Sequence, residues 1–268
     1  MNKIVLYCKS YIGDLGRVQI LLDSIVRYNV NKIPFYISCP RADMAEFKKY
    51  LGDAYYTLID DESIYEDVQG NGWNSQQIVK SSFWKLELCE NYLILDSDSY
   101  FIKHFYVSDF IAPDGEPYTV MHEQKELFGW SCNKERELGF DPIKSFKECR
   151  KPIMDIFGRA SGRYYDFGPS PVIWSCDVWR SLDNDYMKPN KLRFSDLIRM
   201  VPSEFSWYGE YLLAMNRKIY PIEPLFKVFH YKKQYIDHKE MMGYTESEIS
   251  KVYMGIIMQS NAGIPSKY

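Results

Sequence analysis

The sequence has 268 residues but lacks any long hydrophobic run and any strong excess of charge of one sign. Its first apolar stretch, residues 4–6, is too short for a signal peptide and far too short to span a bilayer. We therefore expect a cytoplasmic protein. The formal net charge of −3 gives no field that would attract a polyanion, so the composition argues against a nucleic-acid partner.

The cysteines form neither a dense framework nor a C-x-x-C pair, which favours reduced thiols over a disulfide scaffold. The sequence also lacks internal repeats, low-complexity segments and linkers. A chain of this length without such boundaries is expected to form one domain, residues 1–268, with a sizeable core. The six cysteines are Cys8, Cys39, Cys89, Cys132, Cys149 and Cys176.

Aromatic side chains are abundant, at 16% of the chain, and include 23 Tyr and 6 Trp. The hydrophobic fraction of 46% and the charged fraction of 26% are those of a globular protein. Because amphipathic rings pack against sugars and nucleobases as well as in cores, the aromatic content favours a carbohydrate partner without establishing one.

Short apolar runs alternate with helical patterns in the first part of the chain. This alternation predicts a mainly parallel α/β sheet flanked by helices, as in many nucleotide-binding proteins. Since ligands of such sheets lie at the carboxyl ends of the strands, residues 10–17, Asp60 and the residues after the fourth strand are expected to converge. The expected strands are residues 4–8, 33–38, 55–59 and 92–95, and the expected helices follow Asp14 and cover residues 42–51 and 74–90.

The second part of the chain is expected to add strands and helices around this sheet. Asp141 and Pro142 are typical of a helix start, and Gly158 suits the end of that helix. Thr245 and Glu248 match a capping box, which predicts a C-terminal helix with apolar residues at helical spacing from Ile249 to Ile257. Further strands are expected over residues 118–121, 169–174 and 225–230, and a further helix follows residues 203–211.

Asp96 and Asp98 follow the apolar run of residues 92–95, where a buried strand would leave its sheet. Two carboxylates one residue apart repel each other unless a cation or hydrogen-bond donors offset their charge. Oxygen ligands of this kind suit Mg²⁺ or Mn²⁺, which keep coordination positions for water and for substrate phosphates. The alternative is a surface turn, in which Asp side chains cap a helix or bond to their own backbone.

These residues resemble the Asp-x-Asp motif of nucleotide-sugar glycosyltransferases of the GT-A fold. Asp96-Ser97-Asp98 matches that motif in residue type, in its place along the chain and in the preceding apolar run. The stretch of residues 73–103 is also similar to uncharacterised bacterial glycosyltransferases associated with polysaccharides.

The resemblance implies a GT-A (Rossmann-like), mixed and mainly parallel sheet. Residues 1–104 would form the nucleotide-sugar-binding half, and residues 105–268 the acceptor-binding half with the C-terminal helices. It implies Mn²⁺ or Mg²⁺ as cofactor, a nucleotide-sugar donor with a UDP-sugar as first expectation, and a glycan or lipid-linked glycan acceptor. The setting it implies is surface polysaccharide synthesis, with peripheral association at the inner face of the cell membrane.

On the donor side, the resemblance implies that Asp96, Asp98 and His230 hold the metal ion. Each candidate has a structural alternative: Gln77 forms a capping box with Asn74, Lys80 lies on a solvated helix face, and a lone His after a strand is a hydrogen-bonded structural residue. The expected donor-binding residues are Tyr11, Asp14, Arg17, Asp60, Gln77, Lys80, Ser97, Lys232 and Lys233.

On the acceptor side, the resemblance implies contacts from Tyr165, Asp166 and Trp174, although a tryptophan in this place is more often part of the core. In inverting members of the family, an acidic residue at the start of a helix removes the acceptor hydroxyl proton. Glu204 is the first candidate for this base and Glu210 the second. Acidic residues also stabilise a helix N-terminus by charge alone, so a structural role remains open.

Three other functions compete with glycosyl transfer. A haloacid-dehalogenase phosphatase also has Asp-x-Asp after a strand, but that family has the pair near its N-terminus and Thr or Val where this chain has Tyr100. A sugar-phosphate nucleotidyltransferase normally carries a glycine- and basic-rich loop after the first strand, whereas residues 8–17 contain only Gly13 and Gly16. A non-catalytic protein of the same fold would bind a nucleotide or sugar without turnover.

Overall fold

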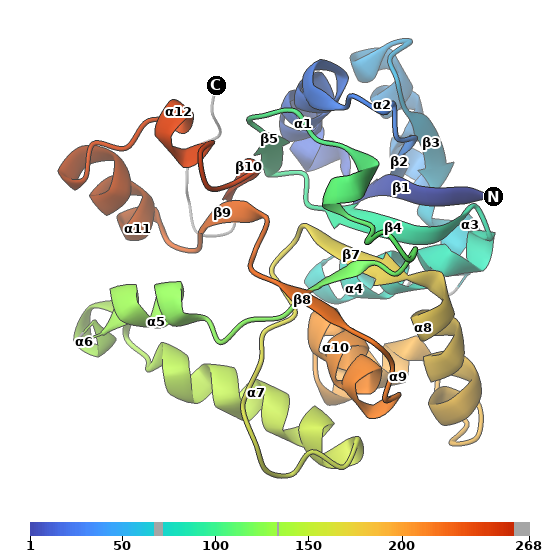
Figure 1. Cartoon of the computed structure of the whole chain (residues 1–268). Coiled ribbons are helices and arrows are strands. Elements are labelled where there is room, and N and C mark those ends of the chain that lie inside the picture. Colours follow the sequence, from blue (N-terminus) through green and yellow to red (C-terminus); the bar gives the residue numbers. More distant parts are fainter. Residues whose placement is uncertain (67–71, 133, 260–268) are drawn as a thin grey trace.

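A computed structural model of the chain describes residues 1–66, 72–132 and 134–259. Its centre is a five-stranded sheet in the order β3-β2-β1-β4-β7, shown in Figure 1. The first four strands of this order are parallel, and β7 runs antiparallel to β4. The prediction of a mixed, mainly parallel α/β sheet is therefore confirmed. The strands are β1 (Asn2–Lys9), β2 (Phe35–Cys39), β3 (Thr57–Asp60), β4 (Cys89–Leu95) and β7 (Val172–Ser175).

Helices cover both faces of this sheet. Successive residues of a strand point to opposite faces, and in these strands both sets of residues are apolar. On β1, Ile4 and Leu6 pack with α1 and α2, whereas Val5 and Tyr7 pack with α4 and α8–α10. The helices are α1 (Leu15–Tyr28), α2 (Met44–Leu51), α3 (Asp61–Ile64), α4 (Trp73–Ser82), α5 (Lys125–Ser131), α6 (Glu135–Leu138), α7 (Pro142–Ile156), α8 (Cys176–Ser181), α9 (Phe194–Met200), α10 (Glu204–Ala214), α11 (Lys232–Ile236) and α12 (Glu246–Ile249).

Two small sheets extend the fold beyond the central one. The first has the order β5-β10-β9, and the second pairs β6 with β8. In Figure 1, helices α5–α7 and helices α11 and α12 project as two lobes on the side away from α2 and β3. Their strands are β5 (Ser99–Phe101), β6 (Tyr118–Val120), β8 (Tyr220–Ile222), β9 (Phe226–Phe229) and β10 (Gly255–Met258).

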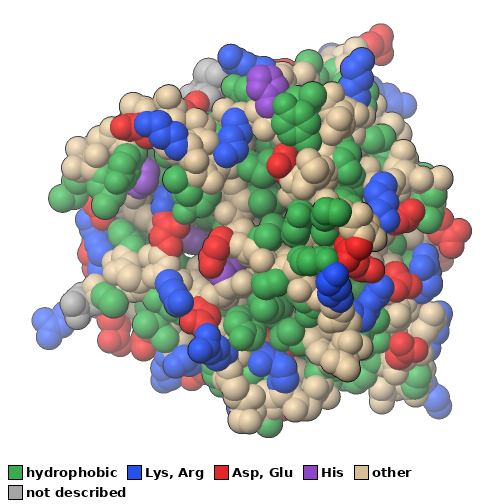
Figure 2. Space-filling view, in the orientation of Figure 1, with side chains coloured by type: hydrophobic (Ala, Val, Ile, Leu, Met, Phe, Trp, Pro, Cys, Tyr) green, Lys and Arg blue, Asp and Glu red, His purple; other side chains and the backbone are tan. Residues whose placement is uncertain are grey.

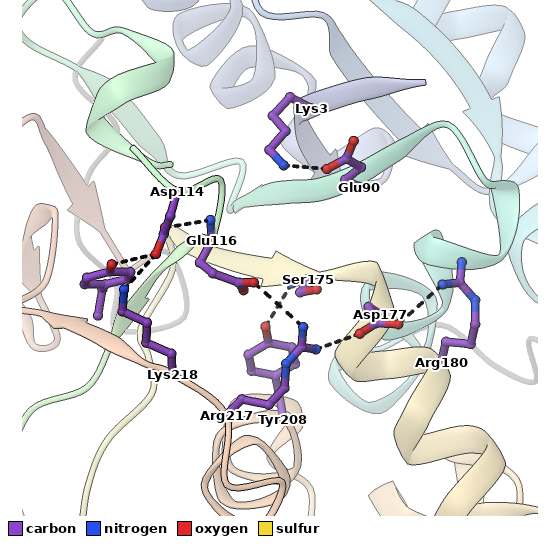
Figure 3. A network of polar contacts seen from close by, with 11 residues as sticks. Lys3, Glu90, Asp114, Glu116, Ser175, Asp177, Arg180, Tyr208, Arg217 and Lys218 are labelled. Carbon is purple, nitrogen blue, oxygen red and sulfur yellow. Dashed lines mark hydrogen bonds and ion pairs between the residues drawn. The ribbon is translucent and has the colours of Figure 1, made fainter. Parts of the chain in front are cut away.

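A surface network lies beside the starts of β1 and β4, where Lys3 pairs with Glu90 at 2.6 Å (Figure 3). The Asp114 carboxylate accepts hydrogen bonds from Lys218 and from the Tyr220 hydroxyl, at 2.8 and 2.7 Å. Arg217 bonds to Asp177 at the start of α8, at 2.6 Å. Exposed ion pairs individually contribute little to the stability of the fold. We infer that this network mainly holds neighbouring surface segments together.

Two sequence-based helix predictions are wrong in part. The helix expected over residues 74–90 ends at Ser82, and the expected capping box is absent because Gly72 is the N-cap residue. The predicted C-terminal helix shrinks to α12, which Thr245 does cap. Beyond it, Gly255–Met258 forms the middle strand β10, held by β5 and β9 on its two sides. Pairing with strands far away in sequence outweighs the helical spacing here.

The remaining predicted elements are present with shifted ends. Asp141 caps α7 by accepting from the backbone N–H groups of Ile143 and Lys144, and the residues of β6, β7, β9 and α10 match their predictions. Within the described residues, no helix is long and apolar enough to cross a membrane.

Candidate functional site

The first polar residues after β4 lie beside the start of α1. The Ser97 hydroxyl donates a hydrogen bond to the Asp14 carboxylate at 2.8 Å, and this contact is buried. Arg17, one turn into α1, bonds to the other oxygen of Asp14 at 2.7 Å. Asp14 therefore connects the two loops at the carboxyl ends of β1 and β4, instead of capping α1 as the sequence predicted.

Asp98 lines a small cavity of about 20 Å³ together with Arg17, Ile20 and Met258. Its backbone carbonyl accepts a hydrogen bond from the N–H of Met258 at 2.9 Å. The loop that carries Asp98 is therefore tied to β10. This cavity has room for about one water molecule, so a larger ligand needs this edge to open.

Asp96 forms an ion pair with Lys80, which projects from α4. The Lys80 side chain is only 3% exposed. Burial lowers the pKa of Lys80, but the negative charges of Asp96 and Glu204 outweigh this effect and raise the pKa above its ordinary value. Lys80 is therefore a buried ammonium group that neutralises one of the two motif carboxylates.

Glu204 is the first residue of α10 and is buried beside this ion pair. Its backbone N–H donates to the side-chain oxygen of Gln77 at 3.1 Å, so Gln77 joins α4 to α10 instead of completing a capping box. Burial raises the pKa of the Glu204 carboxyl to about 7, although the Lys80 charge acts in the opposite direction. A carboxyl with that pKa can exchange a proton near neutral pH.

One buried thiol shows that these charges converge. Burial raises the pKa of the Cys8 thiol at the end of β1, and the charges of Asp96, Asp14 and Asp98 act in the same direction. Lys80 opposes them. We call Asp14, Lys80, Asp96, Asp98 and Glu204 the sheet-edge cluster.

Glu210, the second candidate base, has a structural contact instead. Its carboxylate is fully buried and binds Arg159 through two hydrogen bonds, Nε to Oε2 at 2.7 Å and Nη2 to Oε1 at 2.9 Å. This pair joins α10 to the end of α7. Because a carboxylate held in this way cannot readily accept a substrate proton, Glu204 is the better candidate.

His230 follows β9 directly, and the strand register brings it towards Asp98. Phe229 pairs with Met258 of β10, and the N–H of Met258 bonds to Asp98. Burial lowers the pKa of His230 to about 4, so its ring is neutral at pH 7. Across the described residues, however, no three His, Cys, Asp or Glu side chains are arranged to hold a metal ion. The predicted set of Asp96, Asp98 and His230 is not assembled.

His230 instead lines a cavity of about 680 Å³, which we call the His230 cavity. One wall is the segment between β6 and α5, and the other consists of β9 with the residues that precede β10. Figure 2 shows a hollow between the lobe of α5–α7 and the lobe of α11 and α12, with carboxylate and histidine side chains beside it. The polar wall residues used below are His122, Gln124, Glu126, Tyr165, Glu223 and His230.

The predicted acceptor residues occupy three different environments. Tyr165 lines the His230 cavity, as an acceptor contact requires. Asp166 is buried behind the wall, where Arg150 binds its carboxylate at 2.7 Å and lowers its pKa against the opposing effect of burial. Trp174 is 1% exposed in the core between β4 and α10. This burial prevents a direct contact with an acceptor and corrects that expectation.

Two glycines allow the segment of Tyr165 and Asp166 to pack closely on α10. A Cβ atom on Gly209 would lie 1.9 Å from the Phe167 ring, and one on Gly168 would lie 2.9 Å from the Phe205 ring. Such contacts are too short for any other residue. The helix that begins with Glu204 is thus held against the chain that forms one side of the His230 cavity.

The other predicted donor-binding residues do not join the sheet-edge cluster. Tyr11 is 50% exposed before the 3₁₀ turn Ile12–Asp14. Asp60 caps α3 through Ser63 and pairs with Arg41 at 2.8 Å. Lys233 forms surface ion pairs with Asp237 and Glu137. The side chain of Lys232 lies outside the described part of the chain.

Sequence reasoning missed several buried polar residues at the site. His122 and Gln124 follow β6, and both lie on the wall of the His230 cavity. Asp61, next to the predicted Asp60, is buried and forms an ion pair with Lys9 at 3.2 Å. Each of these residues follows a strand, and ligands of such sheets bind at strand ends. That position could have identified all three from the sequence.

Comparison with known proteins gives a family but no activity. The model of a family described as "Family of unknown function (DUF6492)" matches residues 3–248, which is most of the chain. No curated protein matches the sequence. The arrangement of the residues themselves must therefore support any assignment of function.

Proposed function

The chain belongs to DUF6492, a family of unknown function, and we propose that it is a metal-dependent glycosyltransferase with a GT-A arrangement. It would transfer a sugar from a nucleotide diphosphate, with UDP as the first candidate, to a glycan or lipid-linked glycan. The observation that carries the proposal is the position of Asp96 and Asp98. They follow a parallel strand at its carboxyl end and lie beside a buried lysine and a carboxyl with a pKa of about 7.

The two aspartates fit a divalent cation in residue type and number. Mg²⁺ and similar ions are commonly held by one or two carboxylates, with water and substrate phosphates completing the coordination. Asp98 supplies one carboxylate. Asp96 has one oxygen bound to Lys80, which leaves its second oxygen for a metal ion. When bound, Mn²⁺ or Mg²⁺ would neutralise charge on the phosphates of the leaving group.

The cationic side chains of this edge have separate roles in the proposal. Lys80 pairs with the Asp96 carboxylate and keeps it in place. Arg17 lines the cavity beside Asp98 and bonds to Asp14, so it is the cation from α1 that can reach a donor phosphate. Bidentate guanidinium groups are well suited to phosphate oxygens.

Glu204 is the proposed general base. An acceptor hydroxyl has a pKa far above neutral pH, so its attack needs a group that accepts the proton. Glu204 lies at the start of α10, which packs against the segment of Tyr165 beside the His230 cavity. Its pKa of about 7 allows both protonation states at neutral pH.

A test by turnover uses the purified full chain with a panel of nucleotide sugars. We expect release of the nucleoside diphosphate that requires Mn²⁺ or Mg²⁺, stops with EDTA and is lost in Asp98→Asn. The matched control is Asp23→Asn, on the exposed face of α1, which should release the nucleotide at the wild-type rate. Release that is independent of metal, or equal in Asp98→Asn and wild type, would contradict the proposal.

The same panel separates the competing functions. Thermal stabilisation by a nucleotide sugar without any release would identify a non-catalytic binding protein, because a ligand that binds only the folded state raises its stability. Pyrophosphate release from a nucleoside triphosphate and a sugar phosphate would identify a nucleotidyltransferase.

A further inference from the structure

We propose that the His230 cavity binds the acceptor, and that it accepts a saccharide without negative charge, either neutral or bearing an amino group. The identification of this saccharide as the acceptor rests on the proposed function. The binding of such a saccharide rests on the cavity alone. Its volume of about 680 Å³ lies within the range of roughly 300–1,000 Å³ that is usual for pockets enclosing small ligands.

The first wall of the cavity is held by a buried carboxylate. Asp166 accepts hydrogen bonds from the side chains of Gln124 and Arg150 and from the N–H of Gly168, the last at 3.1 Å. Its backbone also pairs with His122 in both directions, at 3.0 and 2.7 Å. Because every one of these contacts is buried or partly buried, the wall has a defined shape before any ligand arrives.

The second wall is linked to the first by Glu126 of α5. The Glu126 carboxylate pairs with Lys227 of β9 and accepts a hydrogen bond from the Tyr253 hydroxyl at 2.9 Å. Further out, the ring of Trp130 stacks on Tyr231, with centroids 5.5 Å apart and planes 16° apart. These contacts join segments far apart in sequence and set the separation of the two walls.

The lining offers hydrogen-bonding groups together with an aromatic ring. The ring nitrogens of His230 form no hydrogen bond with any residue that the structure describes, and its pKa of about 4 leaves them neutral at pH 7. The side-chain oxygen of Gln234 accepts a hydrogen bond from the backbone N–H of His230 at 2.8 Å. The side-chain amide hydrogens of Gln234 can therefore bind a ligand. Tyr165 adds an aromatic side chain to the lining. Hydroxyl groups on an otherwise apolar ring are the natural complement of such a surface.

The charges around the cavity disfavour an acidic ligand. Lys227 is engaged by Glu126, and Glu123 is paired with Lys125 and Arg163 at 3.6 and 3.0 Å. Each cation beside the cavity thus already faces a carboxylate, with Lys125 and Arg163 sharing Glu123. Glu223 lies on the wall and forms no ion pair with a described residue. A uronate or phosphate group would meet this negative charge without a counter-ion, whereas an amino group would be attracted to it.

Calorimetric titration of the full chain at pH 7, without donor or metal, tests the proposal directly. The probes are three disaccharides of similar size: cellobiose, which is neutral, the glucosamine dimer, which is cationic, and the galacturonate dimer, which is anionic. We expect the first two to bind and the galacturonate dimer to bind at least about tenfold more weakly, a difference of about 1.4 kcal/mol. Like charges about 4 Å apart near a protein surface repel by roughly 1–4 kcal/mol. Binding of the galacturonate dimer as tightly as cellobiose, or binding of none of the three, would overturn the proposal.

Two variants locate the binding. Tyr165→Ala should weaken cellobiose binding about fivefold through loss of the ring contact, whereas Tyr50→Ala, on the exposed face of α2, should not. Glu223→Gln should reduce the preference for the glucosamine dimer over the galacturonate dimer, whereas Glu46→Gln on α2 should keep it. Unchanged binding in Tyr165→Ala with unchanged thermal unfolding would place the saccharide elsewhere.

The titration and the turnover assay fail independently. Metal-dependent release of nucleotide without saccharide binding at Tyr165 would leave the glycosyltransferase proposal intact and remove this one. Saccharide binding without any nucleotide release would do the opposite.

Discussion

The sheet-edge cluster and the His230 cavity are both polar, but they satisfy their charges in opposite ways. At the sheet edge, the charged groups bind one another: Lys80 pairs with Asp96, and Arg17 pairs with Asp14. The cavity beside them has only about 20 Å³. In the His230 cavity, the ion pairs lie in the walls and brace them, so about 680 Å³ remains open.

The sheet-edge cluster must therefore rearrange before it can bind a ligand, whereas the His230 cavity is already open. A metal ion and a diphosphate bring charges that compete with the internal pairs of the sheet edge, so binding there requires an exchange of partners. A saccharide without charge can enter the His230 cavity while its ion pairs stay in place. We therefore expect a metal ion and its anionic diphosphate to act at the sheet edge, and a neutral or amino-bearing saccharide to bind in the His230 cavity.

The largest expected effect is on turnover at the sheet edge. Asp98→Ala should lower nucleotide release by at least about 10²-fold, because single electrostatic contacts to a transition state are typically worth about 3–4 kcal/mol. Cellobiose binding should be unchanged in the same variant. Initial rates and calorimetry on one preparation give both values, and Asp23→Ala is the control. A loss of cellobiose binding would end the separation of the two sites.

A second effect distinguishes the two glutamates of α10. Glu210→Ala should destabilise the protein by about 3 kcal/mol, since it leaves Arg159 without its buried partner. Denaturant unfolding measures this value. Glu204→Gln should be no less stable than wild type and should lose turnover instead. If Glu210→Ala unfolds like wild type, the ion pair with Arg159 does not hold α7 against α10.

A third effect concerns pH. The folded-state pKa of Glu204, about 7, exceeds its ordinary value of 4.5. Between these two pKa values, the folded protein holds a proton on Glu204 that the unfolded chain releases. The stability that this proton binding contributes is therefore lost as the pH rises from about 5 to 7. Relative to Glu204→Gln, the wild type should lose stability across that range in EDTA. Thermal unfolding at a series of pH values checks this, with the exposed Glu46→Gln as control; parallel curves for wild type and Glu204→Gln would contradict it.

The same ionisation should control the rate. A glutamate acts as a general base in its carboxylate form, so the rate of sugar transfer should rise through pH 7 with Glu204 present. Glu204→Gln should abolish that rise. A wild-type rate that is flat from pH 6 to pH 8 would remove Glu204 from the role of base.

The smallest expected effect lies at the rim of the sheet edge. Asp60→Ala removes the N-cap of α3 and should cost about 1 kcal/mol of stability. We expect the KM for the donor to stay at its wild-type value, because the Asp60 carboxylate is already bound by Arg41 and Ser63. A clear increase in that KM would extend the donor site as far as β3.

The sequence was sufficient for the central sheet because its strands are short apolar runs separated by helices with apolar residues at helical spacing. The order of β1 to β4 and the position of Asp96 and Asp98 at a strand end follow from that local pattern. It was insufficient for β10, whose Ile256 and Ile257 also fit a helix. Only pairing with β5 and β9 decides that segment, and both partners are distant in sequence.

The same distinction between local patterns and long-range contacts applies to the candidate site. Spacing alone found Asp96, Asp98 and the start of α10, since each lies at the end of a recognisable element. It missed the ion pair of Lys80 with Asp96 and the contact of Gln77 with α10. It also missed the His230 cavity, whose walls come from four separate segments. Contacts of that kind depend on tertiary packing, which no local pattern reports.

The most direct test of the account is anomalous diffraction at the manganese edge from crystals grown with Mn²⁺ and UDP. We expect one anomalous peak at the sheet edge, from a metal ion bound by the carboxylates of Asp98 and Asp96 and by the diphosphate. A map without a peak there, with Lys80 still paired to Asp96 and UDP bound elsewhere, would contradict it.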